Sequence, residues 1–387
     1  MVSFLHACQN QRVMLRVDWN VPIKKGCIVD ATRIDASLST IKALLAMQAN
    51  IIVVSHLGRP TGPSVDESLR LVVDYLSQKL DRSIPLLKDW PNCSPNNHNI
   101  AVAENIRFHP EELENNAEFS KKMAKHCDVL MMDAFATAHR KHASTYGVLD
   151  YVETACLGPL VLKETSHLDR FLKQNESPCL GIVGGKKIST KLPLLFSLLE
   201  KVDVLVLLGA MANTCLAAFG YEMGSSFIEP SCFEQARKLQ EQVKKMGKKL
   251  LLPEDLLFAY PDGSQKILPI DQADDQASAM DIGSTTIAKT CRLIEQSSSL
   301  LWCGPAGLFE NDEFSLGTQS IALALARHRG YSLIGGGDTL AAAKRFDIAN
   351  KVSYASTGGG AFLAYLAEGS LPVIDRIKRK EYGIKAQ

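Results

Sequence analysis

The stretch LIGGGDTLAA, residues Leu333 to Ala342, joins an apolar run to a helix-forming segment through three glycines. Glycine lets a backbone approach a bulky group and adopts dihedral angles that other residues avoid. A strand that passes through glycines into a helix leaves backbone N–H groups unpaired at the helix N-terminus, where anions such as phosphate bind. Asp338 adds a hard oxygen ligand for Mg²⁺ and Thr339 adds a hydroxyl. The spacing matches neither the P-loop nor GxGxxG, and Asp338 could equally be a simple helix cap.

Similar apolar runs recur along the chain and are rich in Val, Ile and Leu, as in NIIVVSH (50–56) and VDVLVLLGA (202–210). Amphipathic segments typical of helices separate them, for example 66–80 and 230–247. Apolar strands that alternate with such helices indicate parallel sheets covered on both faces. With 387 residues, the chain is predicted to form two doubly wound, parallel-sheet α/β domains of Rossmann-like type.

The domain junction is predicted on a long helix that starts at Leu157 and ends in a polar turn near Pro178. Its apolar residues recur near helical spacing. We therefore expect domains at 1–156 and 177–373 with an interdomain helix at 157–176.

Composition limits the class of protein. The chain is 46% hydrophobic and 22% charged with a net charge of +1, which argues against nucleic acid or an acidic membrane as a partner held by bulk charge. No apolar run is long enough to span a bilayer, and the N-terminus lacks the pattern of a signal peptide. The ten cysteines show no C-x-x-C pair. We expect reduced thiols and a cytoplasmic protein without a zinc site.

In the first half, cationic side chains follow the predicted strands, where open parallel sheets bind ligands. Arginine forks suit phosphate and carboxylate, so the set predicts a small ligand with several negative charges. A single one of these arginines could equally form a surface ion pair. The set is Arg33, His56, Arg59, Arg107, His139 and Arg140, with Asp18 and Asn20 beside them.

In the second half, the segments after the strands are rich in glycine. Lys187 and Lys191 are four residues apart, which predicts one shared helix face, although Lys191 alone could be a solvated lysine. Asp338 is the candidate Mg²⁺ ligand and Glu310 a candidate acceptor for a ribose hydroxyl. These features outline a site for a nucleoside triphosphate.

One domain for a small anion and one for a nucleotide suggest phosphoryl transfer between them. No serine elbow, Cys–His pair or carboxylate dyad stands out as a catalytic base. A carboxylate acceptor is already ionised at pH 7 and needs none. Catalysis would then consist of positioning and charge neutralisation.

The order and content of these segments resemble phosphoglycerate kinase. The resemblance rests on RVDWNVP, ATRIDASLSTI, SHLGRP, DAFATAHRKHAST, GGKKISTKL, GPAGLFE, GGGDT and STGGGAF, which run from Arg16 to about Leu371. It implies reversible transfer of a phosphoryl group between 1,3-bisphosphoglycerate and ADP, giving 3-phosphoglycerate and Mg-ATP. It also implies a glycolytic, cytoplasmic monomer whose two domains close on a hinge around a cleft, with residues 374–387 packed on the first domain.

Carried over by motif, the resemblance implies a role for each candidate. Arg33 would reach the transferring phosphoryl group opposite Lys187, with Gly337 and Gly360 as further catalytic positions. Asp338 would bind Mg²⁺. The glycerate ligand would be held by Asp18, Asn20, Arg33, His56, Arg59, Arg107 and Arg140. The nucleotide would be held by Lys187, Lys191, Gly209, Glu310, Gly336, Gly337, Asp338 and Thr339.

Several positions depart from the family pattern and put nucleotide affinity and base preference in question. Leu208 and Ala210 flank Gly209 where glycines are usual, and Cys303 stands in place of an Asn. We expect side chains at 208 and 210 to narrow the slot for the base. A catalytically weak, phosphoglycerate kinase-like nucleotide-binding protein is the alternative. It predicts loss of at least one of four charged residues, and all four are present: Arg33, Lys187, Lys191 and Asp338. A dinucleotide-dependent dehydrogenase is disfavoured because no GxGxxG follows an early strand.

Overall fold

The structure is a computed structural model, and it describes residues 7–94, 98–174 and 176–381. The chain divides into two compact units, residues 1–165 with 370–387 and residues 166–369. The division falls inside helix α6 (Pro159–Gln174), within the segment expected to join the domains. Residue 175 of that segment and residues 382–387 of the expected C-terminal extension lie outside the described residues.

The first unit is built on a six-stranded parallel sheet in the order β5-β6-β4-β1-β7-β8. The central strand β1 pairs with β4 and β7, so that Val13 lies opposite Ile51 and Val129. Most strand residues are buried, as expected for a parallel sheet covered on both faces. The strands are β1 (Arg12–Arg16), β4 (Asn50–Val54), β5 (Leu86–Leu87), β6 (Ile100–Ala103), β7 (Val129–Met132) and β8 (Thr154–Leu157).

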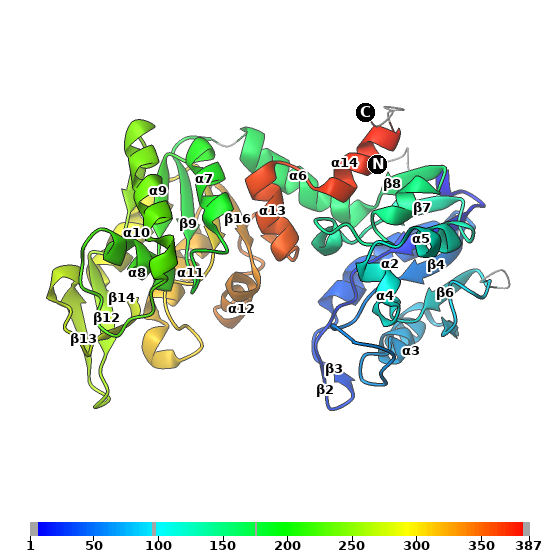
Figure 1. Ribbon diagram of the computed structural model, residues 1–387, viewed down its shortest axis with the longest axis horizontal. Helices are drawn as coiled ribbons and strands as arrows, with labels where there is room; N and C mark the ends of the chain where they lie inside the picture. The colour runs from blue at the N-terminus through cyan, green and yellow to red at the C-terminus, as the bar shows by residue number, and fades with distance from the viewer. Residues whose placement is uncertain (1–6, 95–97, 175, 382–387) are drawn as a thin grey trace. The chain divides into compact units, whose positions relative to one another are not determined.

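Helices of the first unit pack through apolar stripes. In α2 (Thr32–Ala46) the buried residues Ile34, Ile41 and Leu44 recur at helical spacing and join the core of the sheet. Helix α14 (Pro372–Glu381), red in Figure 1, returns from the far end of the chain to pack on β8. The other elements are α3 (Arg70–Leu80), α4 (Pro110–Leu113), α5 (Ala117–Ala124), the hairpin β2 (Ile23–Lys24) with β3 (Cys27–Ile28), and the 3-10 turns η1 (Ile106–Phe108), η2 (Phe135–Thr137) and η3 (Gly147–Asp150).

The second unit has a parallel sheet in the order β11-β10-β9-β15-β16-β17. By position along the chain this is 3-2-1-4-5-6, the strand order of the dinucleotide-binding fold, and it reverses between β9 and β15. Ligands bind at such a reversal, outside the carboxyl ends of the strands. The strands are β9 (Cys179–Val183), β10 (Val204–Leu207), β11 (Lys249–Leu251), β15 (Ser299–Cys303), β16 (Tyr331–Gly335) and β17 (Tyr354–Ser356).

Helices connect these strands, and several of them start directly after a strand or its glycine-rich loop. They are α7 (Leu192–Lys201), α8 (Gly209–Ala218), α9 (Phe233–Lys245), α10 (Ser284–Gln296), α11 (Leu316–Arg327), α12 (Gly337–Arg345) and α13 (Gly360–Glu368), with 3-10 turns η4 (Pro230–Cys232), η5 (Ile270–Gln272) and η6 (Asp312–Phe314). The predicted fold class of two parallel-sheet α/β domains is confirmed.

The sequence did not predict the three-stranded antiparallel sheet β13-β12-β14, which lies at one end of the second unit in Figure 1. Its strands are β12 (Asp255–Ala259), β13 (Gln265–Pro269) and β14 (Ser278–Ile282). Strand β13 is mostly exposed and β14 is only partly buried, so neither has the continuous apolar run of a buried strand. Strands β5 and β8 were also missed. Among the described helices, none is both long and apolar enough to cross a bilayer.

Candidate active site

The first candidate site lies at the carboxyl ends of β1, β4 and β7, where the strand order of the first unit reverses. Asp18 and Asn20 follow β1, and His56 follows β4. The side chain of Asn20 accepts a hydrogen bond from the N–H of Gly58 at 2.9 Å. This bond joins the loop after β1 to the loop after β4, so the two segments present their polar groups together.

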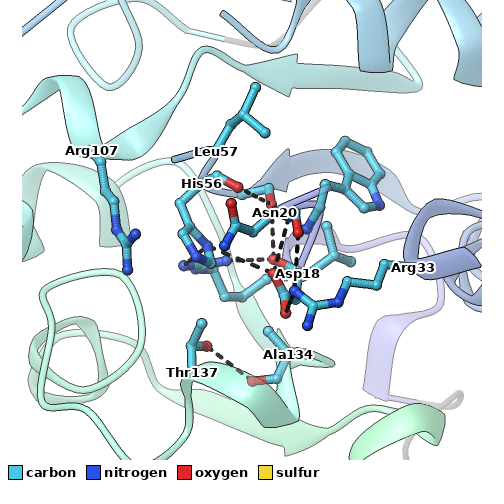
Figure 2. A network of polar contacts seen from close by, with 12 residues as sticks. Asp18, Asn20, Arg33, His56, Leu57, Arg107, Ala134 and Thr137 are labelled. Atoms are coloured by element: carbon cyan, nitrogen blue, oxygen red, sulfur yellow. Dashed lines mark hydrogen bonds and ion pairs between the residues drawn. The ribbon is translucent and has the colours of Figure 1, made fainter. Parts of the chain in front are cut away.

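Arg33, near the start of α2, is tied to the loop after β1. Its Nη1 lies 2.9 Å from Oδ2 of Asp18 and donates to the carbonyl of Asn20 at 3.1 Å. Figure 2 shows His56, Asp18 and Asn20 between Arg33 and Arg107. These two contacts hold the Arg33 guanidinium beside the loop after β1.

His56 is almost fully buried and is held from behind by a residue that the sequence did not single out. Nη2 of Arg16 lies 3.4 Å from Nδ1 of His56. A guanidinium can only donate, so Nδ1 accepts and Nε2 carries the ring proton. Nδ1 is 4.0 Å from Asp18, too far for a hydrogen bond. Burial, with the positive charges of Arg16, Arg107, Arg140 and Arg33, holds the pKa of His56 well below its ordinary value. His56 is thus a neutral donor.

Arg16 itself belongs to a buried polar network. Its Nε donates to Oγ of Ser144 at 2.9 Å, and the Ser144 hydroxyl donates to Oε1 of Glu112 at 2.7 Å. The N–H of Ser144 donates to the other Glu112 oxygen at 2.7 Å. Burial raises the pKa of Glu112, although Arg16 and Ser144 oppose the rise. Glu112 lies 3.9 Å from His142, whose pKa burial lowers to about 4.

The remaining cations of the set differ in how firmly they are held. Nη1 of Arg107 donates to the carbonyl of Gly58 at 2.6 Å, and burial lowers the pKa of Arg107 to about 10. Nε of Arg140 donates to Nε2 of His139 at 3.1 Å. Arg59 is exposed, and its backbone N–H donates to Glu67 at 2.9 Å. Arg107 and Arg140 are close enough to lower the pKa of His56 together with Arg33, so the first unit gathers these charges around one point.

The second candidate site lies at the reversal between β9 and β15. Nζ of Lys191 donates to the carbonyl of Gly184. A Cβ on Gly185 would lie 2.9 Å from this ammonium and a Cβ on Gly304 would lie 2.7 Å from it. Glycine at both positions therefore leaves room for the Lys191 side chain between the ends of the two strands.

The expectation that Lys187 and Lys191 share a helix face is wrong. Helix α7 begins at Leu192, and both lysines lie in the turn before it. Pro193 in the first turn supports that start. Lys187 is exposed, and its ammonium forms no hydrogen bond or ion pair with any residue that the structure describes. It is therefore available to a ligand, whereas Lys191 is fixed by backbone.

The opening stretch forms the strand-to-helix junction that its glycines predicted. Gly336 has φ of +101°, which favours glycine, and α12 begins at Gly337. The hydroxyl of Thr339 is buried and accepts from the N–H of Gly304 at 2.7 Å. It therefore holds the end of β15 against α12, and its own proton remains to be donated. Gly360 starts α13 in the same manner after β17.

A cavity of about 580 Å³ opens beside the starts of α8 and α12, within the second unit. Gly185, Gly209, Glu310 and Asp338 line it. The carboxylate of Asp338 is exposed and has no hydrogen bond or ion pair to any described residue. Within residues 7–94, 98–174 and 176–381 no cluster of three His, Cys, Asp or Glu side chains could hold a metal. A metal at Asp338 would take most of its ligands from a bound phosphate and water, a coordination typical of Mg²⁺.

Of the two residues that depart from the family pattern beside Gly209, only one lies where we expected it. Leu208 is fully buried in the apolar core, and it does not line the cavity. Ala210 does line it. Only Ala210 of the two can affect the space for a base. Cys303 is buried at the end of β15, and burial raises the pKa of its thiol.

The sequence missed Arg16, Glu112 and Ser144, which support the first site, and Asn213, which lines the cavity of the second. A charged residue inside the apolar run of β1 was a signal for Arg16. Glu112 and Ser144 come from segments with no periodic pattern, so nothing in the sequence joined them.

Comparison with known proteins agrees with this geometry. A family model described as phosphoglycerate kinase matches residues 5–369. The phosphoglycerate kinase of Coxiella burnetii is 41% identical over 381 residues, which cover 96% of this chain and 97% of that protein. The phosphoglycerate kinase of Legionella pneumophila (strain Lens) is 42% identical over 383 residues, with 97% and 96% covered.

Solved structures give the same result. The Coxiella burnetii phosphoglycerate kinase structure superposes with a TM-score of 0.89 at 41% identity, covering 96% of this chain and 97% of that one. The enzyme from Pyrococcus horikoshii OT3 gives a TM-score of 0.81 at 27% identity, with 98% of both chains covered. The chain therefore belongs to the phosphoglycerate kinase family.

Proposed function

We propose that this chain catalyses the reversible, Mg²⁺-dependent transfer of a phosphoryl group from 1,3-bisphosphoglycerate to ADP, giving 3-phosphoglycerate and ATP. One observation carries the proposal. Each unit has a polar site at the point where its strand order reverses, and the two sites suit different ligands. The first gathers guanidinium groups around His56. The second combines a lysine turn, helix N-termini and a cavity with a free carboxylate.

In the first unit, the glycerate ligand would be bound by arginine side chains and by a neutral histidine. Arg107, Arg140 and Arg59 would neutralise the non-transferring phosphate. His56, held neutral by Arg16, would donate Nε2–H to an oxygen of the glycerate. Asp18 and Asn20 would accept from its hydroxyl group. Arg33, paired with Asp18, would reach the transferring phosphoryl group.

In the second unit, the nucleotide phosphates would lie at the N-termini of α8 and α12, where unpaired N–H groups favour anions. Gly209, Gly336 and Gly337 would let the phosphates approach the backbone. Lys191 would contact them from the end of β9. Glu310 would accept from the ribose.

Mg²⁺ fits this site because Asp338 offers a carboxylate without a protein partner. When bound, the ion would draw charge from the nucleotide phosphates. Lys187, which is free in the turn before α7, would neutralise the phosphoryl group during transfer, with the N–H of Gly360 beside it.

The chemistry needs no catalytic base. The acceptor of the reverse reaction is a carboxylate, already ionised at neutral pH, so the protein's contribution is positioning and charge neutralisation. We propose direct in-line transfer without a phosphoenzyme. Because the two ligands are held on different units, the units would have to close to bring them together and exclude water. We also propose that the enzyme is cytoplasmic and monomeric and that it acts in glycolysis and gluconeogenesis. We expect no nucleic-acid or membrane partner.

A coupled assay tests this function. ATP and 3-phosphoglycerate would be supplied with and without Mg²⁺, and 1,3-bisphosphoglycerate formation would be followed as NADH oxidation through a dehydrogenase. Turnover that requires both 3-phosphoglycerate and Mg²⁺ is expected. Folded protein that binds ATP but gives no turnover would instead indicate a catalytically weak nucleotide-binding protein.

A further inference from the structure

The turn that carries Lys187 is held by a carboxylate to which the proposed function gives no role. Glu229 comes directly before η4 and lies 40 residues along the chain from Ser189. One of its oxygens accepts from the Ser189 hydroxyl at 2.6 Å, and the other accepts from the Ser189 N–H at 3.2 Å. Burial raises the pKa of Glu229, but the Ser189 donors and the N–H of Ile188 hold it below its ordinary value. The side chain is therefore an ionised acceptor at neutral pH.

The backbone of Glu229 is anchored to α8, the helix that begins at the second candidate site. Its N–H donates to Oγ1 of Thr214 at 3.1 Å, and this hydroxyl donates to the carbonyl of Ala210 at 3.2 Å. Thr214 is fully buried within α8. Because its backbone is fixed in this way, the carboxylate connects α8 to the turn before α7.

The other end of the turn is attached to the same helix. The N–H of Met211, in the first turn of α8, donates to the carbonyl of Gly185 at 3.1 Å. Within the turn, Oγ1 of Thr190 donates to the carbonyl of Lys187 at 3.1 Å. Lys187 therefore lies between two attachments to α8, one at Gly185 and one through Glu229. Its backbone is fixed, although its ammonium forms no hydrogen bond with any described residue.

These contacts suit positioning better than they suit stability. Ser189 is exposed and Glu229 is only partly buried, and hydrogen bonds in contact with water contribute little to the free energy of unfolding. The position of a catalytic charge matters far more, because a displacement of about 1 Å can lower a rate about a hundredfold. A lysine side chain is long and flexible, so the place that its ammonium can reach depends on where its backbone is held.

We infer that Glu229 is a positioning residue that fixes the turn so that Lys187 reaches the phosphoryl group during transfer. This inference rests on the proposed function, since it takes Lys187 as the group that neutralises the transferring charge. Glu229 acts through Lys187 and contacts no substrate. Loss of its contacts should therefore lower kcat and leave the KM values for ATP and 3-phosphoglycerate within about twofold of the wild type.

Glu229→Gln tests the inference in the coupled assay. The substitution keeps the size of the side chain but removes its charge and one of its two acceptor oxygens, so we expect kcat to fall at least about tenfold. Glu234→Gln is the matched control, because it removes the same charge from a side chain that is exposed on α9 and lies 2.6 Å from Lys238. The control should keep its kcat. An unchanged kcat in Glu229→Gln would overturn the inference.

A double-mutant cycle separates positioning from a merely structural role. If Glu229 acts through Lys187, Glu229→Gln should lower kcat by less than about twofold when it is added to Lys187→Ala. A merely structural residue would lower kcat by the same factor in both backgrounds, and that result would overturn the inference. Thermal unfolding of each variant shows that the kinetics are measured on folded protein.

Hydrogen–deuterium exchange over residues 185–191 tests the contact without turnover. The N–H of Ser189 should exchange at least about tenfold faster in Glu229→Gln than in the wild type or in Glu234→Gln. Unchanged exchange would show that Glu229 does not hold the turn. Faster exchange with a normal kcat would remove the positioning role and leave the kinase standing. A wild-type protein without turnover would remove the proposed function and, with it, the role of Glu229 in transfer, whatever the exchange result.

Discussion

The guanidinium of Arg16 and the hydroxyl of Ser144 are joined by a hydrogen bond of 2.9 Å between two fully buried side chains. The same hydroxyl donates to Glu112 at 2.7 Å. Ser144 therefore links a buried cation to a buried carboxylate, and the cation in turn holds Nδ1 of His56. Fully satisfied networks of this kind fix side chains in place, whereas a broken one leaves unpaired groups in a region of low dielectric.

Ser144→Ala tests this link. The substitution leaves Nε of Arg16 and an oxygen of Glu112 without a partner, so the free energy of unfolding should fall by about 1–3 kcal/mol. Urea unfolding would measure it. Ser39→Ala, on the exposed face of α2, serves as the control and should change stability by less than about 0.5 kcal/mol. Equal effects of the two variants would show that the network contributes nothing.

His142 should make stability depend on pH. Its pKa is about 4 in the folded protein against an ordinary 6.5, so the unfolded chain binds more protons between these values. The contribution of His142 to stability is therefore fully present above pH 6.5 and is lost as the pH falls toward 4. When the pH falls from 7.5 to 5.0, the shifted pKa of His142 should lower the free energy of unfolding by about 2 kcal/mol.

Urea unfolding of the wild-type protein and of His142→Gln at pH 7.5 and 5.0 isolates that contribution. Asp281 acts in the opposite sense, because burial raises the pKa of its carboxyl to about 6, but it is present in both proteins and cancels in the difference. The variant should lose about 2 kcal/mol less than the wild type. An identical loss in both would contradict the assignment.

The sequence predicted most of the parallel sheets because each buried strand is a continuous apolar run followed by a turn signal. The polar residues after those runs were found for the same reason, since the carboxyl ends of parallel strands share one edge. Strand β13 could not be found, because its residues are mostly exposed and form no buried apolar run. It is a strand only because it pairs with β12 in the folded chain.

The candidate site was predictable where a charge follows a strand and was not where a contact joins distant segments. Glu112 and Ser144 are separated by 32 positions and meet only in the folded chain. The start of α7 was misplaced because Lys187 and Lys191 have helical spacing, whereas the turn is set by backbone contacts such as the bond from Lys191 to Gly184. Leu208 could not be placed in the core without knowing which way the end of β10 faces.

Alanine substitutions at Gly336 and Gly337 distinguish the effect of backbone strain from the effect of blocking a ligand. Gly336 has φ of +101°, so Gly336→Ala should lower stability by about 1–3 kcal/mol. Gly337 lacks a positive φ, and an added Cβ there would meet no heavy atom within 4 Å. Gly337→Ala should leave stability unchanged or raise it by about 0.4–1 kcal/mol.

The same Gly337→Ala protein should nevertheless have a KM for ATP at least about tenfold higher, because the methyl group would keep phosphate away from the N-terminus of α12. Thermal unfolding and steady-state kinetics give the two readouts. An unchanged KM would remove Gly337 from the phosphate site.

Asp338→Ala tests the metal assignment. Turnover should fall by orders of magnitude, while the affinity for 3-phosphoglycerate, measured by calorimetry, should stay within about twofold, since we propose that this ligand binds the other unit. Because the carboxylate is exposed at the start of α12, stability should change by no more than about 1 kcal/mol. Glu241→Ala, on the exposed surface of α9, is the control. Near-normal turnover in Asp338→Ala would exclude this carboxylate as the metal ligand.

Arg33→Ala should reduce the rate more than the binding of substrate. Nη1 of Arg33 is held by Asp18 at 2.9 Å and by the carbonyl of Asn20 at 3.1 Å, and we propose that this guanidinium neutralises charge that develops during transfer. An interaction made chiefly in the transition state lowers kcat with little change in KM. We expect kcat to fall by at least about a hundredfold, and Arg33→Lys to restore only part of it because lysine lacks the fork.

The control for this charge is Arg70→Ala. Arg70 is exposed on α3, and its guanidinium lies 3.8 Å from Asp74, a pair that contributes little to stability. Its removal should leave kcat and KM unchanged in the coupled assay. If Arg33→Ala raised the KM for 3-phosphoglycerate and left kcat intact, Arg33 would bind the ground state, and the neutralisation of transferring charge would have to come from Lys187 and the helix N-termini of the second unit.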